Sequence, residues 1–173
     1  MNLYDASVPV FIAMLENLAG ILAKAQTWAT ENGKSDEDVL QARLAPDMFP
    51  LVKQVQIASD NAKSISARLA GEEPPKMEDI EATFAELIER TEKTVAYLKT
   101  LDREKFEGAE GRHIPFPYVP DTYLLGQEAL LQSYLPNFFF HVTTAYDILR
   151  NQGVPLGKAD YIGTLPLKPN VEV

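Results

Sequence analysis

The sequence predicts an all-α domain in which four long helices form a bundle. Four segments carry apolar residues at alternating steps of three and four, which places these residues on one face of a helix. Glycines and prolines gather between the segments, and the missing alternation of strands argues against a parallel sheet. A length of 173 residues is typical of one domain, so we predict a single four-helix bundle over residues 1–173.

The first three helices follow from their apolar stripes. They are expected at residues 4–32, 46–70 and 78–101, and a short acidic helical turn is expected at residues 35–38. Each stripe gives its helix a face to bury against the others. The stripes are Phe11, Leu15, Leu18, Leu22, Ala25 and Ala29, then Leu51, Val55, Ala58, Ala62, Ile65 and Leu69, then Ile80, Phe84, Leu87, Ile88, Thr91, Val95, Leu98 and Leu101.

An acidic run surrounds the start of the third helix. Eight acids lie between Glu72 and Glu92, against Lys76 and Arg90. Acidic side chains near a helix N-terminus interact favourably with the helix dipole and remain in water at little cost. We interpret the run as a solvated helix face, with a surface that binds cations as the alternative.

The last helix follows a long connection. Residues 102–125 hold two glycines and three prolines, which exclude a helix there, and residues 114–119 are expected as an extended edge strip. The fourth helix is expected at residues 125–152, interrupted or restarted at Pro136. An irregular C-terminal strap follows Gly153 and is expected to be anchored by Tyr161, Ile162, Leu165 and Leu167.

Composition removes several classes of function. The chain has no cysteine, and its 16 basic and 25 acidic residues give a net charge of −9, which argues against a nucleic-acid partner. We find no apolar run near the roughly 20 residues of a membrane span, and Asp5 replaces the basic start of a signal peptide. A soluble, cytoplasmic protein without membrane contact is therefore expected. Nucleophile elbows, phosphate-binding loops and paired Glu-x-x-His motifs are missing from the sequence.

The two histidines are the most informative polar residues. His113 lies in the connection and is expected on the surface, whereas His141 lies on the fourth helix, one turn after Asn137. Tyr134 precedes them by about another turn, and Gln54 flanks the stripe of the second helix. These four residues, Gln54, Asn137, His141 and Tyr134, are the candidate ligand pocket. Either His141 helps to hold a metal, or it is a core histidine hydrogen-bonded to Asn137, a tyrosine or a backbone carbonyl.

Three consecutive phenylalanines precede His141. Phe138, Phe139 and Phe140 point in three directions around a helix, so one bundle core cannot bury all of them. An exposed aromatic of this kind marks an interface more often than a base-stacking platform. We expect at least one of the three rings to face a partner helix or the connection.

The run from Leu135 to Arg150, followed by Gly153 and Val154, resembles the signature of an uncharacterised bacterial family. That family of unknown function is grouped with the DinB/YfiT-like four-helix-bundle superfamily. Residues 3–11, 43–48 and 157–163 are similar to the same family, so the resemblance covers nearly the whole chain.

The resemblance implies a DinB-like bundle, commonly a homodimer, with a metal site between helices in catalytic relatives. Those relatives hold their metal with three histidines, one on the second helix and two spaced by four on the last. Here His141 resembles the final ligand, and Asn137 and Gln54 stand roughly where the other two histidines would be. The resemblance therefore implies a degenerate metal pocket in which the three-histidine pattern is incomplete.

Three hypotheses follow. The first is a non-catalytic homodimer that binds a small ligand or is purely structural, with no cofactor. The second is a metal-dependent transferase or hydrolase, with a divalent ion at His141, Asn137 and either Gln54 or Asp60. The third is a protein-interaction module that uses residues 138–140 or the strip at 112–120. We favour the first, because carboxamides are poor ligands for transition metals.

Overall fold

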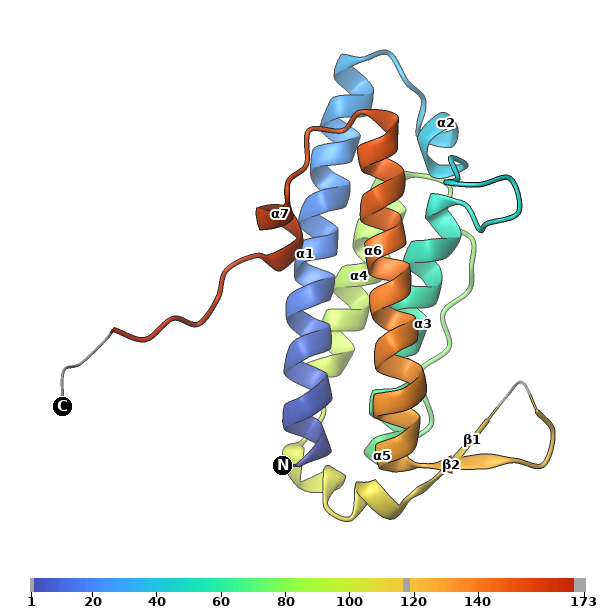
Figure 1. The fold of residues 1–173 in the computed structure, drawn as a ribbon, viewed down its shortest axis with the longest axis vertical. Coiled ribbons are helices and arrows are strands. Elements are labelled where there is room, and N and C mark those ends of the chain that lie inside the picture. Colours follow the sequence, from blue (N-terminus) through green and yellow to red (C-terminus); the bar gives the residue numbers. More distant parts are fainter. Residues whose placement is uncertain (1, 117–118, 170–173) are drawn as a thin grey trace.

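The computed structural model describes residues 2–116 and 119–169. Four long helices lie side by side in it: α1 (Leu3–Glu31), α3 (Leu51–Leu69), α4 (Phe84–Leu98) and α6 (Leu135–Gln152) (Figure 1). Helix α1 packs mainly against α4, and α3 packs against α6. Their apolar stripes form one continuous core that includes Phe11, Phe84 and Phe138. The predicted all-α four-helix bundle is confirmed.

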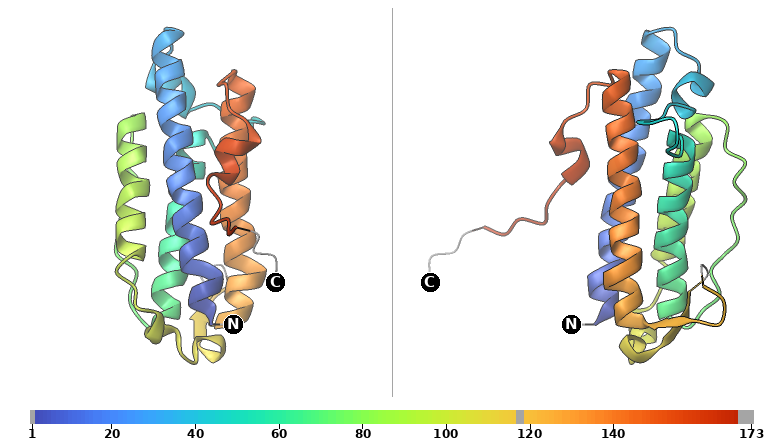
Figure 2. Two further views of the ribbon diagram at one scale, coloured as in Figure 1. Left: turned by 90° about the vertical axis from the view of Figure 1, so that its left-hand side faces the viewer. Right: turned by 45° about the vertical axis from the view of Figure 1, so that its right-hand side comes forward.

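The helix directions differ from a simple up-and-down bundle. Helices α1 and α6 run one way, while α3 and α4 both run the other way, so the chain must cross back between α3 and α4 (Figure 1). The nineteen residues of α3 span about 28 Å at 1.5 Å per residue. A return over that distance takes roughly nine extended residues. Residues 72–83, which we call the crossover, make this return along the outside of the bundle (Figure 2).

Two predicted helix starts are wrong, one of them because of the crossover. The third helix begins at Phe84 instead of residue 78, where Thr83 caps it and Glu86 completes a capping box. Ile80 therefore lies in the crossover with 75% of its surface exposed, and it does not belong to a buried stripe. The second helix begins at Leu51 instead of residue 46, with Pro50 at its N-cap. The expected acidic turn is confirmed as α2 (Asp36–Leu40).

The long connection contains short structured pieces. These are η1 (Arg103–Phe106), η2 (Ala109–Gly111) and an antiparallel hairpin of β1 (His113–Pro115) with β2 (Tyr123–Leu125). Pro117 and Tyr118, part of the expected strip, lie outside the described residues. His113 is exposed, as predicted, and its ring stacks on Tyr123 at 3.8 Å.

The predicted fourth helix is a nearly continuous helical run in three parts. It comprises α5 (Gly126–Glu128), a π-helical turn η3 (Ala129–Tyr134) and α6, with Pro136 in the first turn of α6. The wide turn lies directly before the proline, which lacks the N–H that a regular helix would use. Gly126 has room only for hydrogen, because a Cβ there would overlap the backbone of Ala109.

The C-terminal strap is only half anchored. Helix α7 (Lys158–Ile162) packs on α1, where Asn17 Nδ2 donates to the Tyr161 carbonyl at 3.0 Å and Lys24 pairs with Asp160. The expected anchors Ile162, Leu165 and Leu167 are wrong, because all three side chains are exposed, Leu167 by 84%. After α7 the chain extends away from the bundle (Figure 2).

The prediction that no apolar run comes near the length of a membrane span was too strict. Helix α1 is long and apolar enough to cross a membrane by length and composition. Its buried residues, including Leu15, Leu18 and Leu22, lie in the core shared with the other helices. The bundle thus accounts for the buried apolar residues of α1, and it buries 39% of the apolar 18-residue window of this helix.

Candidate functional site

A histidine and a glutamine meet between α3 and α6. His141 lies in the second turn of α6, and Gln54 lies in the first turn of α3. Their side chains are joined by a hydrogen bond of 2.6 Å between His141 Nδ1 and Gln54 Oε1. Because a carboxamide oxygen only accepts, Nδ1 carries the proton and donates it. Gln54 Nε2 donates in turn to the Phe49 carbonyl at 2.9 Å, so the glutamine is fixed from both sides.

Burial keeps this histidine neutral. His141 is 6% exposed, and burial lowers its pKa from 6.5 to about 4. The proton of the neutral ring is held on Nδ1 by Gln54, which leaves a lone pair on Nε2. The exposed ring of Phe140 meets the imidazole edge to face at 5.2 Å. The site is therefore a neutral hydrogen-bonded pair beneath an exposed aromatic ring.

The other two predicted site residues lie apart from this pair. Asn137 is half-buried one turn before His141, and within the described residues its side chain has no hydrogen bond to either partner. The Tyr134 hydroxyl accepts a hydrogen bond of 2.9 Å from Arg68, at the opposite end of α3 from Gln54. Of the four candidates, the structure brings together only Gln54 and His141. The partner of His141 is a side-chain amide of another helix.

The donor atoms do not fit a transition-metal centre. Such centres use at least three imidazole, thiolate or carboxylate ligands, and the described residues contain no group of three His, Cys, Asp or Glu placed to hold an ion. The Gln54 oxygen already accepts the His141 proton. Asp60, the alternative ligand, pairs with Arg90 and Lys63. We therefore derive no chemistry through a metal at this site.

A second polar cluster lies on the other side of α3. Arg90 of α4 is only 2% exposed, and its guanidinium reaches Asp60 of α3 and Asp79 of the crossover, both at 3.0 Å. It also pairs with Glu81 at 2.8 Å and donates to the Glu78 carbonyl at 3.0 Å. One buried cation thus ties the crossover to both helices.

Hydrogen bonding outweighs burial at the acids of this cluster. Burial acts to raise the pKa of Glu81, but hydrogen bonds from Arg90 and Gln56 lower it below its ordinary value. The pKa of Asp79 is lowered in the same way, against burial, by Lys53 and Arg90. These carboxylates therefore stay ionised at neutral pH.

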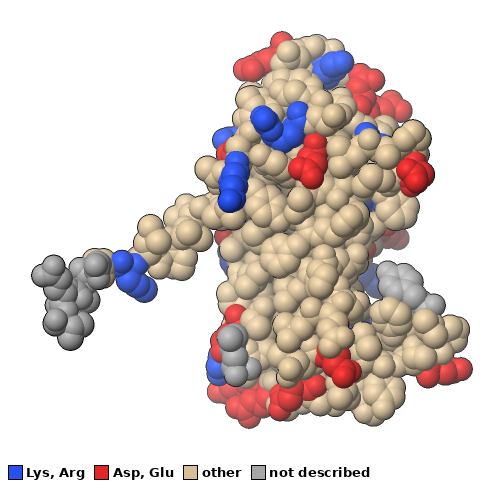
Figure 3. All heavy atoms as spheres, in the orientation of Figure 1, with Lys and Arg blue, Asp and Glu red and all other residues tan. Residues whose placement is uncertain are grey.

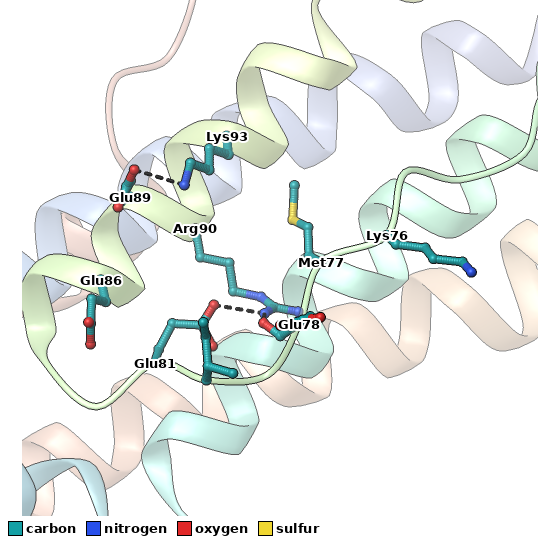
Figure 4. Close-up of a pocket in the computed structure, with 9 residues that line it drawn as sticks. Lys76, Met77, Glu78, Glu81, Glu86, Glu89, Arg90 and Lys93 are labelled. Carbon is teal, nitrogen blue, oxygen red and sulfur yellow. Dashed lines mark hydrogen bonds and ion pairs between the residues drawn. The ribbon is translucent and has the colours of Figure 1, made fainter.

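The largest described pocket lies beside this cluster. It has a volume of about 560 Å³ between the crossover and α4, and Arg90 extends across it toward Glu81 (Figure 4). His141 does not line any described pocket. The hollow surface and the histidine pair are therefore separate features.

Sequence reasoning missed the role of Arg90. The acidic run was interpreted as a solvated face, but Arg90 and Glu81 in it are buried or nearly so. The available signal was the position of Arg90, three residues after Leu87 on the apolar side of its helix. As expected, the core does not bury all three phenylalanines: Phe138 is buried, Phe139 is half-buried and Phe140 is exposed.

Comparison with known proteins agrees with the fold. The family described as domain of unknown function DUF1993 matches residues 3–162. A crystal structure of a DinB family member protein from Shewanella denitrificans is similar, with a TM-score of 0.92 and 42% sequence identity over 97% of this chain and 96% of that chain. Among curated proteins, none matches this sequence. The chain therefore belongs to the DUF1993 family, an uncharacterised family of DinB-like helical bundles.

Proposed function

We propose that this protein is a non-catalytic, homodimeric DinB-like bundle in which a histidine–glutamine pair replaces a metal site. The proposal rests on one observation: two consecutive hydrogen bonds connect His141 through Gln54 to the Phe49 carbonyl. The His141 Nδ1–H and both ends of the Gln54 amide are paired, so Gln54 is a partner of the imidazole instead of a ligand. A cytoplasmic location belongs to the same proposal.

The low basicity of His141 also argues against a catalytic role. A general base is most effective when its pKa lies near the working pH, and burial places that of His141 at about 4. The described residues offer no carboxylate to raise its basicity, because the acids near α3 are paired with Arg90 and Lys63. The function that fits is structural.

Support for a homodimer comes from the surface of α6. Phe140 and Leu131 are exposed, and residues 131–146 contain no Asp, Glu, Lys or Arg. Exposed apolar side chains on an uncharged stretch are typical of an interaction surface. Since most soluble oligomers pair identical chains, a second copy is the simplest partner.

Metal analysis tests the non-catalytic part of the proposal. Protein purified without a histidine tag should contain substoichiometric zinc, nickel, iron and manganese by elemental analysis. Its melting temperature should be the same with and without a chelator, in the wild type and in His141→Ala alike. A stoichiometric metal that disappears in His141→Ala would instead support the metal-dependent enzyme.

Light scattering tests the dimer. The eluted mass should be twice the 19.3 kDa of one chain. Phe140→Asp should shift the population toward the monomer, whereas Ile80→Asp, a matched change at an exposed apolar residue of the crossover, should not. A strict monomer at all concentrations would contradict the dimer.

A further inference from the structure

An uncharged surface runs along α1 and α6. On α1 it consists of Ala6, Val10 and Ala13, and on α6 it consists of Pro136, Phe139 and Phe140. All six are exposed or half-buried, and residues 6–15 of α1, like residues 131–146, carry no charge. Figure 3 shows that charged side chains gather near the ends of this view and leave its middle free. We call these six residues the α1/α6 surface.

The chain itself shows how this side of α1 binds a segment. Helix α7 packs where Asn17 donates to the Tyr161 carbonyl, and the Tyr161 hydroxyl lies 2.9 Å from Thr143 Oγ1 of α6. The Tyr161 ring also meets that of Tyr146 at 5.9 Å. Asn17 continues the helical stripe of Ala13 at a spacing of four. The α1/α6 surface therefore continues the surface that α7 occupies.

The tail after α7 does not continue along this surface. Residues 164–169, which we call the tail, extend away from the bundle with Leu165 and Leu167 exposed (Figures 1 and 2). Two leucines without a burial site are unfavourable in water, by roughly 1.5 to 3 kcal/mol for each side chain that could be buried. Within residues 2–116 and 119–169, one chain thus carries both an apolar tail and an uncharged surface without a partner for either.

Charge indicates where a second copy can approach. Each chain carries a net charge of −9, so two copies repel each other wherever their acidic surfaces meet. The α1/α6 surface avoids this repulsion, and the charge within the tail is the cation of Lys168. Two acidic chains can therefore meet at this surface without like-charge repulsion.

We propose that the tails are exchanged in the homodimer, so that Leu165 and Leu167 of each copy pack on the α1/α6 surface of the other. This inference rests on the homodimer proposed above and adds the segment that covers its surface. The tail leaves its own bundle after α7 with both leucines exposed, so these side chains are free to reach a second copy. Each copy contributes one tail and one surface, as two-fold symmetry requires.

The dissociation constant of the dimer tests the exchange. A Leu165→Asp/Leu167→Asp double variant should weaken the dimer by at least about tenfold, since the lost burial of even one leucine corresponds to roughly that change in affinity. Ala13→Glu, on the other side of the contact, should weaken the dimer similarly. Ile80→Asp is the matched control and should leave the constant unchanged. Analytical ultracentrifugation measures all four proteins, with circular dichroism to verify folding.

Three outcomes are decisive for this inference and for the dimer itself. If the wild type dimerises and both tail and Ala13 variants keep its affinity, the dimer stands and the exchange is overturned. If the wild type stays monomeric, both are overturned. If the tail and Ala13 variants weaken the dimer and Ile80→Asp does not, the exchange is supported.

Cross-linking distinguishes a partner's tail from the chain's own tail. The protein has no cysteine, so an Ala13→Cys/Leu167→Cys double variant carries the only two thiols. Under mild oxidation it should form covalent dimers on a non-reducing gel, and each single variant should form markedly fewer. A monomer band of increased mobility, which an internal disulfide produces, would show that the tail folds back on its own bundle and would overturn the exchange.

Discussion

Two buried polar clusters flank α3, and each contains a buried base. The base is neutral in one cluster and charged in the other. On the α6 side, His141 meets an amide, and burial lowers its pKa to about 4, so it is neutral. On the α4 side, burial acts to lower the pKa of Arg90, but Glu81, Asp60 and Asp79 raise it. The comparison teaches that a base with an ordinary pKa of 6.5 loses its charge on burial without a carboxylate, whereas a guanidinium keeps its charge and is buried together with carboxylates that pair with it.

The largest expected effect comes from removing the charged cluster's cation. Arg90→Met should lower the free energy of unfolding by about 3 to 5 kcal/mol, because it leaves several carboxylates facing one another without a counter-charge. Urea denaturation at pH 7 measures the change. Lys93→Met provides the control, since its pair with Glu89 is exposed and such pairs contribute about 0.5 kcal/mol or less.

Equal effects of the two substitutions would contradict this account of Arg90. The crossover offers a second readout: in Arg90→Met, amide hydrogen exchange of residues 77–81 should become faster than in the wild type. This readout remains informative even if the variant is only partly stable, because it reports on the segment that Arg90 holds.

Acid should lower the free energy of unfolding through His141 by an amount similar to that of Arg90→Met. The folded pKa of His141, about 4, lies below the ordinary value of 6.5, so the unfolded chain takes up the proton first as the pH falls. The contribution of neutral His141 to the free energy of unfolding is complete above about pH 6.5. It is lost as the pH falls to 4, by about 3 kcal/mol in total. The measurement is urea unfolding at several pH values for the wild type and for His141→Phe.

The difference between these two proteins isolates the histidine. The lowered pKa values of Asp79 and Glu81 also cost stability in acid, but they do so in both proteins. The free energy of unfolding of the wild type, relative to that of His141→Phe, should therefore fall between pH 6.5 and 4. A difference that stays constant over this range would show that His141 is not buried as a neutral base.

A smaller effect should separate two glutamines of α3. Gln54→Leu leaves the His141 Nδ1–H and the Phe49 carbonyl unpaired, at a cost of about 2 kcal/mol. Gln56→Leu removes one hydrogen bond to Glu81, which keeps its ion pair with Arg90, so about 1 kcal/mol is expected. Thermal denaturation at pH 7 compares the two variants, and a larger loss for Gln56→Leu would contradict the ranking.

The sequence predicted the helices well because each stripe is a local pattern. Residues such as Leu15, Leu18 and Leu22 recur at helical spacing wherever the helix lies in the fold. The helix starts at Leu51 and Phe84 were less predictable. The start at Phe84 depends on the direction of α4, which forces residues 72–83 to return along the bundle.

The site was predicted only in part, because the position of a residue on its helix is a local pattern and the contact between two helices is not. The importance of His141 and Gln54 followed from the family resemblance and from helical position, but their direct pairing depends on how α3 and α6 pack. The burial of Arg90 depends on how the crossover packs over α4 and on Asp60, which α3 brings from thirty residues away in the sequence. Long-range geometry of this kind leaves little trace in a single sequence.

The most direct test of the central claim is a nitrogen NMR titration of the His141 imidazole, with and without zinc. The account predicts a neutral ring with its proton on Nδ1 from pH 8 down to about pH 5, a pKa of about 4, and no response to stoichiometric zinc. A pKa near 6.5, or a zinc-dependent shift of Nε2 in the folded protein, would contradict it and would restore a metal centre at this position.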